Sequence, residues 1–287
     1  MEETRNENNH EKVNERKHGI VVEHVYKSFG KEHVLVDVNL EIPPGKIYGV
    51  VGNNGSGKTV LMKCICGFMH PDKGQIHVGG SRVGKECDFP DKLGVIIETP
   101  GFLPGISGYK NLKILADLKG RIGKNEIIET LQHVGLNPKM KKPVAKYSLG
   151  MRQRLGIAQA IMENPDVLIL DEPFNGLDKA GVAEMRQLLL SLKESGKAIM
   201  LASHNAQDIE MLCDMYMKWR TGNETKAYSE ENICDGNRGN DVYGIISGRK
   251  RFCSIQSDVI LYRSAGRFCP ADYAGTGNHT GRHKYKG

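Results

Sequence analysis

The 287-residue sequence lacks any apolar run that approaches the roughly 18 residues a membrane-spanning helix requires. Residues 1–18 are polar and charged around a single valine, so they lack the apolar core of a secretion signal. We therefore expect a cytosolic protein that begins with a disordered polar arm over residues 1–18.

Cysteine patterns that mark metal or redox sites are also missing. The seven cysteines include no C-x-x-C pair, which excludes the common zinc-binding and dithiol patterns. We interpret the cysteines as small hydrophobic residues without a catalytic role.

The net charge of +6 is concentrated near the carboxyl end. Residues 216–287 carry 12 Lys and Arg against 7 Asp and Glu, so the rest of the chain is nearly neutral. A basic tail without interleaved aromatic residues is weak support for DNA or RNA binding, and we expect no nucleic-acid partner. The same segment holds ten glycines and a single leucine. We predict an atypical, poorly ordered tail there, and our hypothesis for its origin is an altered reading frame or a degenerate end.

Short apolar runs alternate with segments of helical spacing between these two ends. Four runs each stop at a polar residue or a glycine loop, and they cover residues 47–51, 93–97, 167–170 and 198–202. Runs of this kind suit parallel strands that are covered on both faces. Helical spacing is seen in three sets of residues: Val60, Leu61, Cys64, Ile65 and Phe68; Ile127, Ile128, Leu131 and Val134, closed by Gly135; and Leu155, Ile157, Ala158 and Ile161. The pattern predicts an α/β sheet whose strand ends share one ligand site.

The first of these strand ends carries a phosphate-binding pattern. "GNNGSGKT" fits G-x-x-x-x-G-K-[ST], with a predicted strand before it and a predicted helix after it. Glycines let successive backbone N–H groups point at a polyphosphate, while Lys58 reaches the β- and γ-phosphates and Thr59 holds Mg²⁺. The candidate binding residues are Gly52, Asn53, Asn54, Gly55, Ser56, Gly57, Lys58 and Thr59.

An acidic pair follows the run "VLIL". A buried strand would deliver Asp171 to the same edge of the sheet, where its carboxylate can bind Mg²⁺ directly or through water. Glu172 beside it is placed to polarise the water that attacks a phosphate, and we assign catalytic roles to Glu172 and Lys58.

The segment "YSLGMRQRLGIAQAI", residues 147–161, narrows the choice among phosphate-loop proteins. Ser148 is a good helix N-cap and Gly150 permits close backbone approach, although an ordinary capped surface helix has a similar pattern. The segment resembles the L-S-G-G-Q signature of ATP-binding-cassette (ABC) proteins. The resemblance implies that Ser148, Leu149, Gly150 and Met151 contact the nucleotide held by a second subunit, because one chain does not easily bring both phosphate-binding ends to one nucleotide.

Three further stretches match the ABC family in order. "FNGLD" resembles its D-loop, which implies a nucleotide contact for Asp178, and "ASH" resembles its switch-histidine loop, which implies that His204 contacts the γ-phosphate and acts in catalysis. "KSFG" resembles the loop whose aromatic ring stacks on adenine, which nominates Phe29. A structural histidine and a core phenylalanine are the alternatives at these two positions.

Two departures point to one branch of the family. Glu98 stands where glutamine is usual, and the signature has Leu149 and Met151 for glycine and glutamine. These substitutions resemble the bacitracin- and lantibiotic-resistance ABC ATPases. Glu98, Asp171 and Glu172 would then bring three carboxylates to one Mg²⁺, which would be needed to keep all three ionised.

The resemblance covers roughly residues 20–214 and implies a fold and a working context. The fold is α/β: a P-loop NTPase of the ABC type over 19–215, with a mostly parallel core sheet, an antiparallel β edge and a helical subdomain at about 107–163. The cofactors are ATP and Mg²⁺, and the partners are a second ATPase subunit, like or unlike, and a separate transmembrane permease. We expect peripheral attachment to the inner face of the cell membrane through the permease alone.

The expected function is ATP hydrolysis that powers export of, or resistance to, a peptide antibiotic. Two alternatives remain open at this stage. The abnormal carboxyl-terminal part favours a nucleotide-binding relic or regulatory protein without turnover. The second alternative is a soluble ABC ATPase that acts on ribosomes or DNA. Such proteins usually carry two cassettes or long insertions, whereas this sequence contains one P-loop.

Overall fold

The computed structural model describes residues 19–53, 55–218, 226–227 and 261–263. The predicted polar arm, residues 1–18, and nearly all of the predicted tail, residues 216–287, lie outside the described residues, as does Asn54.

A mostly parallel sheet forms the centre of the domain, with the strand order β10-β9-β3-β8-β7-β6. Neighbours from β9 to β6 run parallel, and the short β10 and β11 pair antiparallel with β9. The strands are β3 (Ile47–Val51), β6 (Leu93–Ile96), β7 (Val167–Asp171), β8 (Ala198–Ala202), β9 (Met215–Lys218), β10 (Lys226–Ala227) and β11 (Leu261–Arg263). The four runs predicted as strands from the sequence are therefore strands of this sheet.

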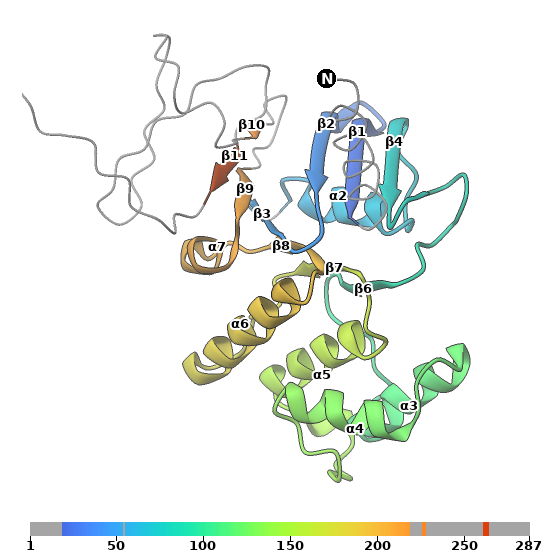
Figure 1. Ribbon diagram of the computed structural model, residues 1–287, viewed down its shortest axis with the longest axis vertical. Coiled ribbons are helices and arrows are strands. Elements are labelled where there is room, and N and C mark those ends of the chain that lie inside the picture. Colours follow the sequence, from blue (N-terminus) through green and yellow to red (C-terminus); the bar gives the residue numbers. More distant parts are fainter. Residues whose placement is uncertain (1–18, 54, 219–225, 228–260, 264–287) are drawn as a thin grey trace, which may run out of the picture.

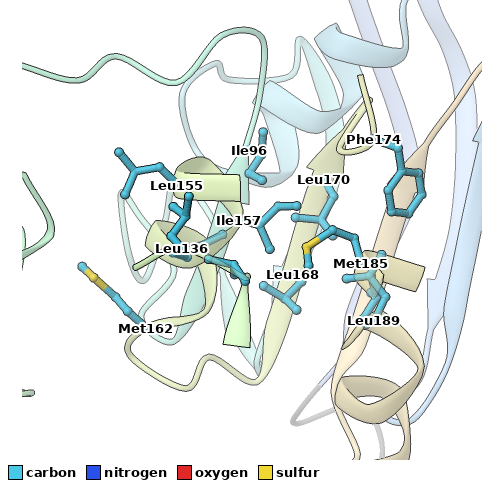
Figure 2. Packing of buried hydrophobic residues seen from close by; sticks show 14 of the residues in the cluster. Ile96, Leu136, Leu155, Ile157, Met162, Leu168, Leu170, Phe174, Met185 and Leu189 are labelled. Atoms are coloured by element: carbon cyan, nitrogen blue, oxygen red, sulfur yellow. The ribbon is translucent and has the colours of Figure 1, made fainter. Parts of the chain in front are cut away.

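Both faces of the central strands β3, β7 and β8 are buried, which explains the continuous apolar runs at residues 47–51, 167–170 and 198–202. In β7, Leu168 and Leu170 belong to a core shared with α5 and α6, as Figure 2 shows. Val167 and Ile169 belong to a second core, shared with α2 and the antiparallel strands. Because neighbouring side chains point to opposite faces of a strand, alternate residues serve the two cores.

An antiparallel sheet covers one of these faces. Its strand order is β2-β1-β4-β5, and its strands are β1 (Ile20–Phe29), β2 (Glu32–Ile42), β4 (Lys73–Val78) and β5 (Ser81–Arg82). Figure 1 shows β1, β2, β4 and α2 on one side of the parallel sheet, with α3, α4 and α5 grouped on the other. The arrangement is the α/β fold that the sequence predicts, with an antiparallel β part and a helical part.

The helices occupy the predicted segments and several others. They are α2 (Lys58–Ile65), α3 (Gly108–Lys119), α4 (Lys124–His133), α5 (Leu149–Ile161), α6 (Lys179–Glu194) and α7 (Ala206–Leu212), with a 3₁₀ turn η1 (Val144–Lys146). Within the described residues, no helix combines the length and the hydrophobicity that spanning a lipid bilayer requires.

The helix after the phosphate loop is shorter than its apolar spacing predicts. The sequence pattern includes Phe68, but α2 ends at Ile65 and Gly67 has a left-handed φ of 82°. A side chain at Gly67 would collide with the carbonyl oxygen of Asp88, so the chain turns away at that glycine. Phe68 is consequently exposed and contacts the ring of Phe89, with 5.8 Å between the ring centroids.

The predicted domain end at residue 215 falls inside a strand. In β9, Met217 is fully buried and pairs with Val50 of β3. A four-residue strand is too short to show apolar periodicity, so the pattern of "MYMK" gave no signal of it.

Candidate nucleotide-binding site

A cavity of about 400 Å³ lies at the carboxyl end of the parallel sheet, beside the loop between β3 and α2. Eight of the predicted site residues line it: Phe29, Gly55, Ser56, Gly57, Lys58, Thr59, Asp171 and Glu172. Lys58 and Glu172, from the ends of two different strands, therefore border the same space.

Glycine is required at two points of the phosphate loop. Gly55 and Gly57 have φ angles of 78° and 107°, a left-handed region that side chains rarely adopt. The loop therefore curls back on itself directly before the first turn of α2, where free backbone N–H groups can meet an anion.

Lys58 is held against the loop that precedes it. The side chain is buried, and its Nζ donates to the carbonyl oxygens of Gly52 at 2.5 Å and Asn53 at 2.9 Å. Burial lowers the pKa of Lys58, and the charges of Asp171 and Glu172 partly oppose that change. A phosphate group placed in the cavity would relieve this cost by supplying a direct counter-charge.

Ser56 has unused hydrogen-bonding capacity in the same loop. Its hydroxyl is buried, and it has no hydrogen-bond partner among the described residues. Buried polar groups are normally paired, so an unpaired hydroxyl beside the curled backbone fits a site built for a polar ligand.

Thr59 and Asp171 form the pair that fits a hard divalent cation. The Thr59 hydroxyl donates to Asp171 Oδ2 at 3.1 Å. Burial raises the pKa of Asp171, while the Thr59 hydrogen bond and the charge of Lys58 lower it. Two oxygen donors at one point suit Mg²⁺, which keeps several waters and takes further ligands from phosphates.

The three carboxylates predicted to share one Mg²⁺ do not form one group in this structure, and the role of Glu98 at the metal stays a prediction. No three acidic, histidine or cysteine side chains form a metal-binding group within the part of the chain that the structure describes. Glu98 is largely exposed and pairs with Lys63 Nζ at 2.6 Å, whereas Glu172 pairs with His204. Each carboxylate has a hydrogen-bond donor of its own, which reduces the repulsion expected between three neighbouring negative charges.

Both oxygens of the Glu172 carboxylate contact His204. Glu172 Oε1 accepts the backbone N–H of His204 at 3.0 Å, and Oε2 lies 2.8 Å from Nδ1 of the ring. Glu172 has a left-handed φ of 49°, and its own N–H donates to the carbonyl of Ala202 in the neighbouring strand. The histidine is thus an exposed partner of Glu172 and is not part of the core.

Gln153 also contacts the site residue Glu172, which the sequence did not predict. Its buried side chain on α5 donates from Nε2 to the carbonyl of Glu172 at 3.2 Å. Within "RQRLG" a glutamine carries no local signal of this bond, because the partner is 19 residues away.

The signature segment lies away from the cavity. Ser148 caps α5 as predicted, since its Oγ accepts the N–H of Met151 at 3.2 Å. A side chain at Gly150 would lie 2.8 Å from the carbonyl oxygen of Gly176, so these two segments of the chain approach each other closely. Leu149 is half exposed and packs on Gly176. Among the described residues that line the cavity, none comes from 148–151.

Asp178 and Phe29 complete the predicted set. Asp178 caps α6 through a bond from the N–H of Gly181 at 2.9 Å to its Oδ1. Phe29 lines the cavity and is 47% exposed, so it is not a core residue. The ammonium of Lys27 lies 5.7 Å from its ring centroid.

Similarity to known proteins agrees with this geometry. A model of the ABC transporter family matches residues 35–175. The bacitracin transport ATP-binding protein BcrA of Enterococcus faecalis is 39% identical over 232 residues, which are 80% of this chain and 75% of that protein. The chain belongs to the ABC transporter family.

Other relatives refine the position of this ABC protein. The lantibiotic transport ATP-binding protein SrtF of Streptococcus pyogenes is 40% identical over 193 residues, covering 67% of this chain and 83% of that protein. The resemblance to the bacitracin and lantibiotic branch, predicted from Glu98 and the signature, is therefore confirmed.

Solved structures share the fold of this ABC protein. The ATP-binding subunit of an ABC transporter superposes with a TM-score of 0.64 at 27% identity, over 70% of this chain and 85% of that one. A dimeric bacterial ABC transporter cassette gives a TM-score of 0.63 at 22% identity, over 70% of this chain and 94% of that one.

Proposed function

We propose that this ABC protein binds ATP with Mg²⁺ in the cavity beside the phosphate loop and hydrolyses it to power a transporter. The observation that carries the proposal is that Lys58 and Glu172 line one cavity together with Thr59 and Asp171. A phosphate-binding cation, a metal-binding pair and a general base then face one bound molecule.

Binding depends on the loop and on Phe29. Backbone N–H groups of residues 55–59 surround the phosphates, and Lys58 exchanges the carbonyls of Gly52 and Asn53 for phosphate oxygens. Phe29, half exposed at the mouth of the cavity, offers its ring to the adenine. Thr59 and Asp171 hold Mg²⁺, which when bound neutralises charge that develops on the phosphate oxygens.

Hydrolysis uses the Glu172–His204 pair. The Glu172 carboxylate accepts a proton from a water molecule while the water oxygen bonds to the γ-phosphorus and the bond to the β-phosphate oxygen breaks, which gives ADP and phosphate. His204, bonded to both oxygens of that carboxylate, holds its orientation. Lys58 stabilises the negative charge that develops on the β-phosphate oxygen as its bond to the γ-phosphorus breaks.

A second subunit completes the site. Ser148 stands at the amino end of α5, with Leu149 half exposed beside it, so this end is available to another molecule's nucleotide. The proposed assembly is a dimer in which each signature faces the partner's phosphate loop, with Asp178 near the shared boundary.

The proposed cargo follows from the relatives. Proteins named for bacitracin and lantibiotic transport share about 40% of aligned residues with this chain. We propose that the dimer joins a separate transmembrane permease at the inner face of the cell membrane and that its substrate is a peptide antibiotic.

The test of hydrolysis is an ATPase assay on the full chain with bound nucleotide measured in parallel. Glu172→Gln should keep nucleotide binding and lower turnover about 100-fold or more, the usual contribution of a general base. Glu184→Gln, which removes an exposed carboxylate paired with Arg154, is the matched control and should keep wild-type turnover. Equal turnover in the wild type and Glu172→Gln would favour a nucleotide-binding protein without hydrolysis.

The test of the membrane partner is fractionation. The chain should pellet with membranes when a neighbouring permease gene is co-expressed and remain in the supernatant without it. Pelleting that does not depend on the permease would contradict attachment through that partner.

A further inference from the structure

A buried ion pair joins α6 to α7 directly behind the loop that carries His204. Arg186 donates from Nε to Asp208 Oδ1 at 3.0 Å, and its Nη2 contacts the same oxygen. The Asp208 side chain is 3% exposed and that of Arg186 is 12% exposed. A carboxylate this deeply buried needs a cation and further hydrogen bonds to remain stable as a charge.

The second oxygen of Asp208 is bonded to the residue before His204. The hydroxyl of Ser203, itself buried, donates to Asp208 Oδ2 at 3.0 Å. Since the Ser203 proton points at Asp208, its oxygen is free to accept, and it accepts the N–H of Asn205 at 3.1 Å. Asp208 therefore fixes a tight turn of the backbone around His204.

His204 is also held by Glu172. Glu172 accepts the backbone N–H of His204 at 3.0 Å and meets its ring at 2.8 Å. The backbone around the histidine is thus held by Ser203, which Asp208 fixes, and by Glu172. The exposed histidine ring itself has no apolar pocket to hold it, because its side chain is 64% exposed.

As an acidic residue in the first turn of α7, Asp208 also suits the positive end of that helix. Docking α7 on α6 needs only apolar contacts, which cost less desolvation than a buried ion pair. Asp208, at the start of α7, instead accepts a hydrogen bond through its second oxygen from Ser203, the residue before His204.

We propose that Asp208, held by Arg186, is a positioning residue for ATP hydrolysis that acts through Ser203 to keep His204 on Glu172. The inference rests on the proposed hydrolytic function. It assigns no contact with the nucleotide to Asp208, so its removal should lower turnover and leave the affinity for ATP nearly unchanged.

The experiment measures kcat and KM for ATP in the full chain. Ser203→Ala removes the link and keeps the ion pair, and it should lower kcat about 10-fold with little change in KM. Asp208→Asn should lower kcat at least as much. The double variant should be no slower than Asp208→Asn alone, because both changes break one chain of contacts. If Asp208→Asn does not fold, Ser203→Ala decides the question by itself.

Asp214→Asn is the matched control. Asp214 also pairs with a cation on α6, Lys193 at 2.7 Å, and also accepts a backbone N–H, that of Ile47 at 2.9 Å. Ile47 begins β3, so this pair lies at the edge of the sheet opposite the phosphate loop. Asp214→Asn should lower the free energy of unfolding and keep kcat.

Three results would overturn the inference: wild-type kcat in Ser203→Ala, effects that multiply in the double variant, or an equal loss of kcat in Asp214→Asn. Glu172→Gln in the same assay separates this failure from that of the proposed function. If Glu172→Gln is inactive while Ser203→Ala is unimpaired, only the positioning role is wrong. If the wild type has no turnover, both proposals are wrong.

Discussion

The Glu172 carboxylate contacts His204 twice: it accepts the backbone N–H of His204 at 3.0 Å, and it lies 2.8 Å from Nδ1 of the histidine ring. The two residues follow neighbouring parallel strands, β7 and β8, which pair through Asp171 and Ala202. Two contacts with one residue therefore fix the orientation of the Glu172 carboxylate. In the proposed hydrolysis, a general base held in this way needs no rearrangement when a water molecule arrives, which favours proton transfer.

The ring and the backbone of His204 should contribute separately to ATP turnover. His204→Ala keeps the backbone N–H bond to Glu172 and removes the ring contact, so we expect kcat to fall about 100-fold while nucleotide binding persists. Turnover and equilibrium nucleotide binding, measured on the same preparation, check this outcome. Wild-type turnover in His204→Ala would assign the histidine a structural role.

The raised pKa of Asp171 predicts a direction for stability against pH. Burial raises this pKa above the ordinary 3.8, so between 3.8 and the raised value the folded chain binds a proton that the unfolded chain does not. The free energy of unfolding should therefore fall as pH rises through that window, and Asp171→Asn should lack this part of the fall.

Urea unfolding of both chains from pH 4 to pH 7, without nucleotide or Mg²⁺, tests the direction. A difference between the wild type and Asp171→Asn that stays constant, or that favours the wild type increasingly as pH rises, would contradict it.

Glu98 and Lys63 should change Mg²⁺ affinity in opposite directions. Glu98 pairs with Lys63 at 2.6 Å, and the charge of Glu98 raises the pKa of Asp171. Glu98→Gln should weaken Mg²⁺ binding in the presence of ATP about 3-fold, and Lys63→Gln should strengthen it by a similar factor, because exposed pairs carry modest energies. Titrating Mg²⁺ in the ATPase assay measures both, and changes in the same direction would rule out the opposition.

Tyr48 offers a stability test inside the second core. Its hydroxyl is buried and has no hydrogen-bond partner within the described part of the chain. Tyr48→Phe should therefore leave the free energy of unfolding unchanged or raise it by up to about 1 kcal/mol. Tyr147→Phe is the control: its buried hydroxyl accepts the N–H of Gly108 at 3.2 Å, and its loss should cost about 1 kcal/mol. Equal losses in the two variants would reveal an unrecognised partner of Tyr48.

The parallel strands were predictable because burial on both faces leaves continuous apolar runs. Residues 47–51 and 198–202 are strands at their predicted positions. Gly135 closes α4 as its sequence position predicts, with a left-handed φ of 72°. These features are local, so the sequence contains the signal.

Features that depend on distant partners were not predictable. Lys63 neutralises Glu98 from 35 residues away, and Arg186 reaches Asp208 from 22 residues away. Neither residue belongs to a motif, and charged residues at helical positions are common on exposed faces. The strand β9 was missed for another reason: four residues give too short a pattern, and its neighbours in the sheet decide its place.

The most direct test of the account is the structure of Glu172→Gln in complex with ATP and Mg²⁺. We predict that the γ-phosphate lies between Lys58 and residue 172, that Lys58 leaves the carbonyls of Gly52 and Asn53 for phosphate oxygens, and that the metal contacts Thr59 and Asp171. A triphosphate bound in another cavity, or a Lys58 that stays on its two carbonyls beside a bound nucleotide, would contradict the account.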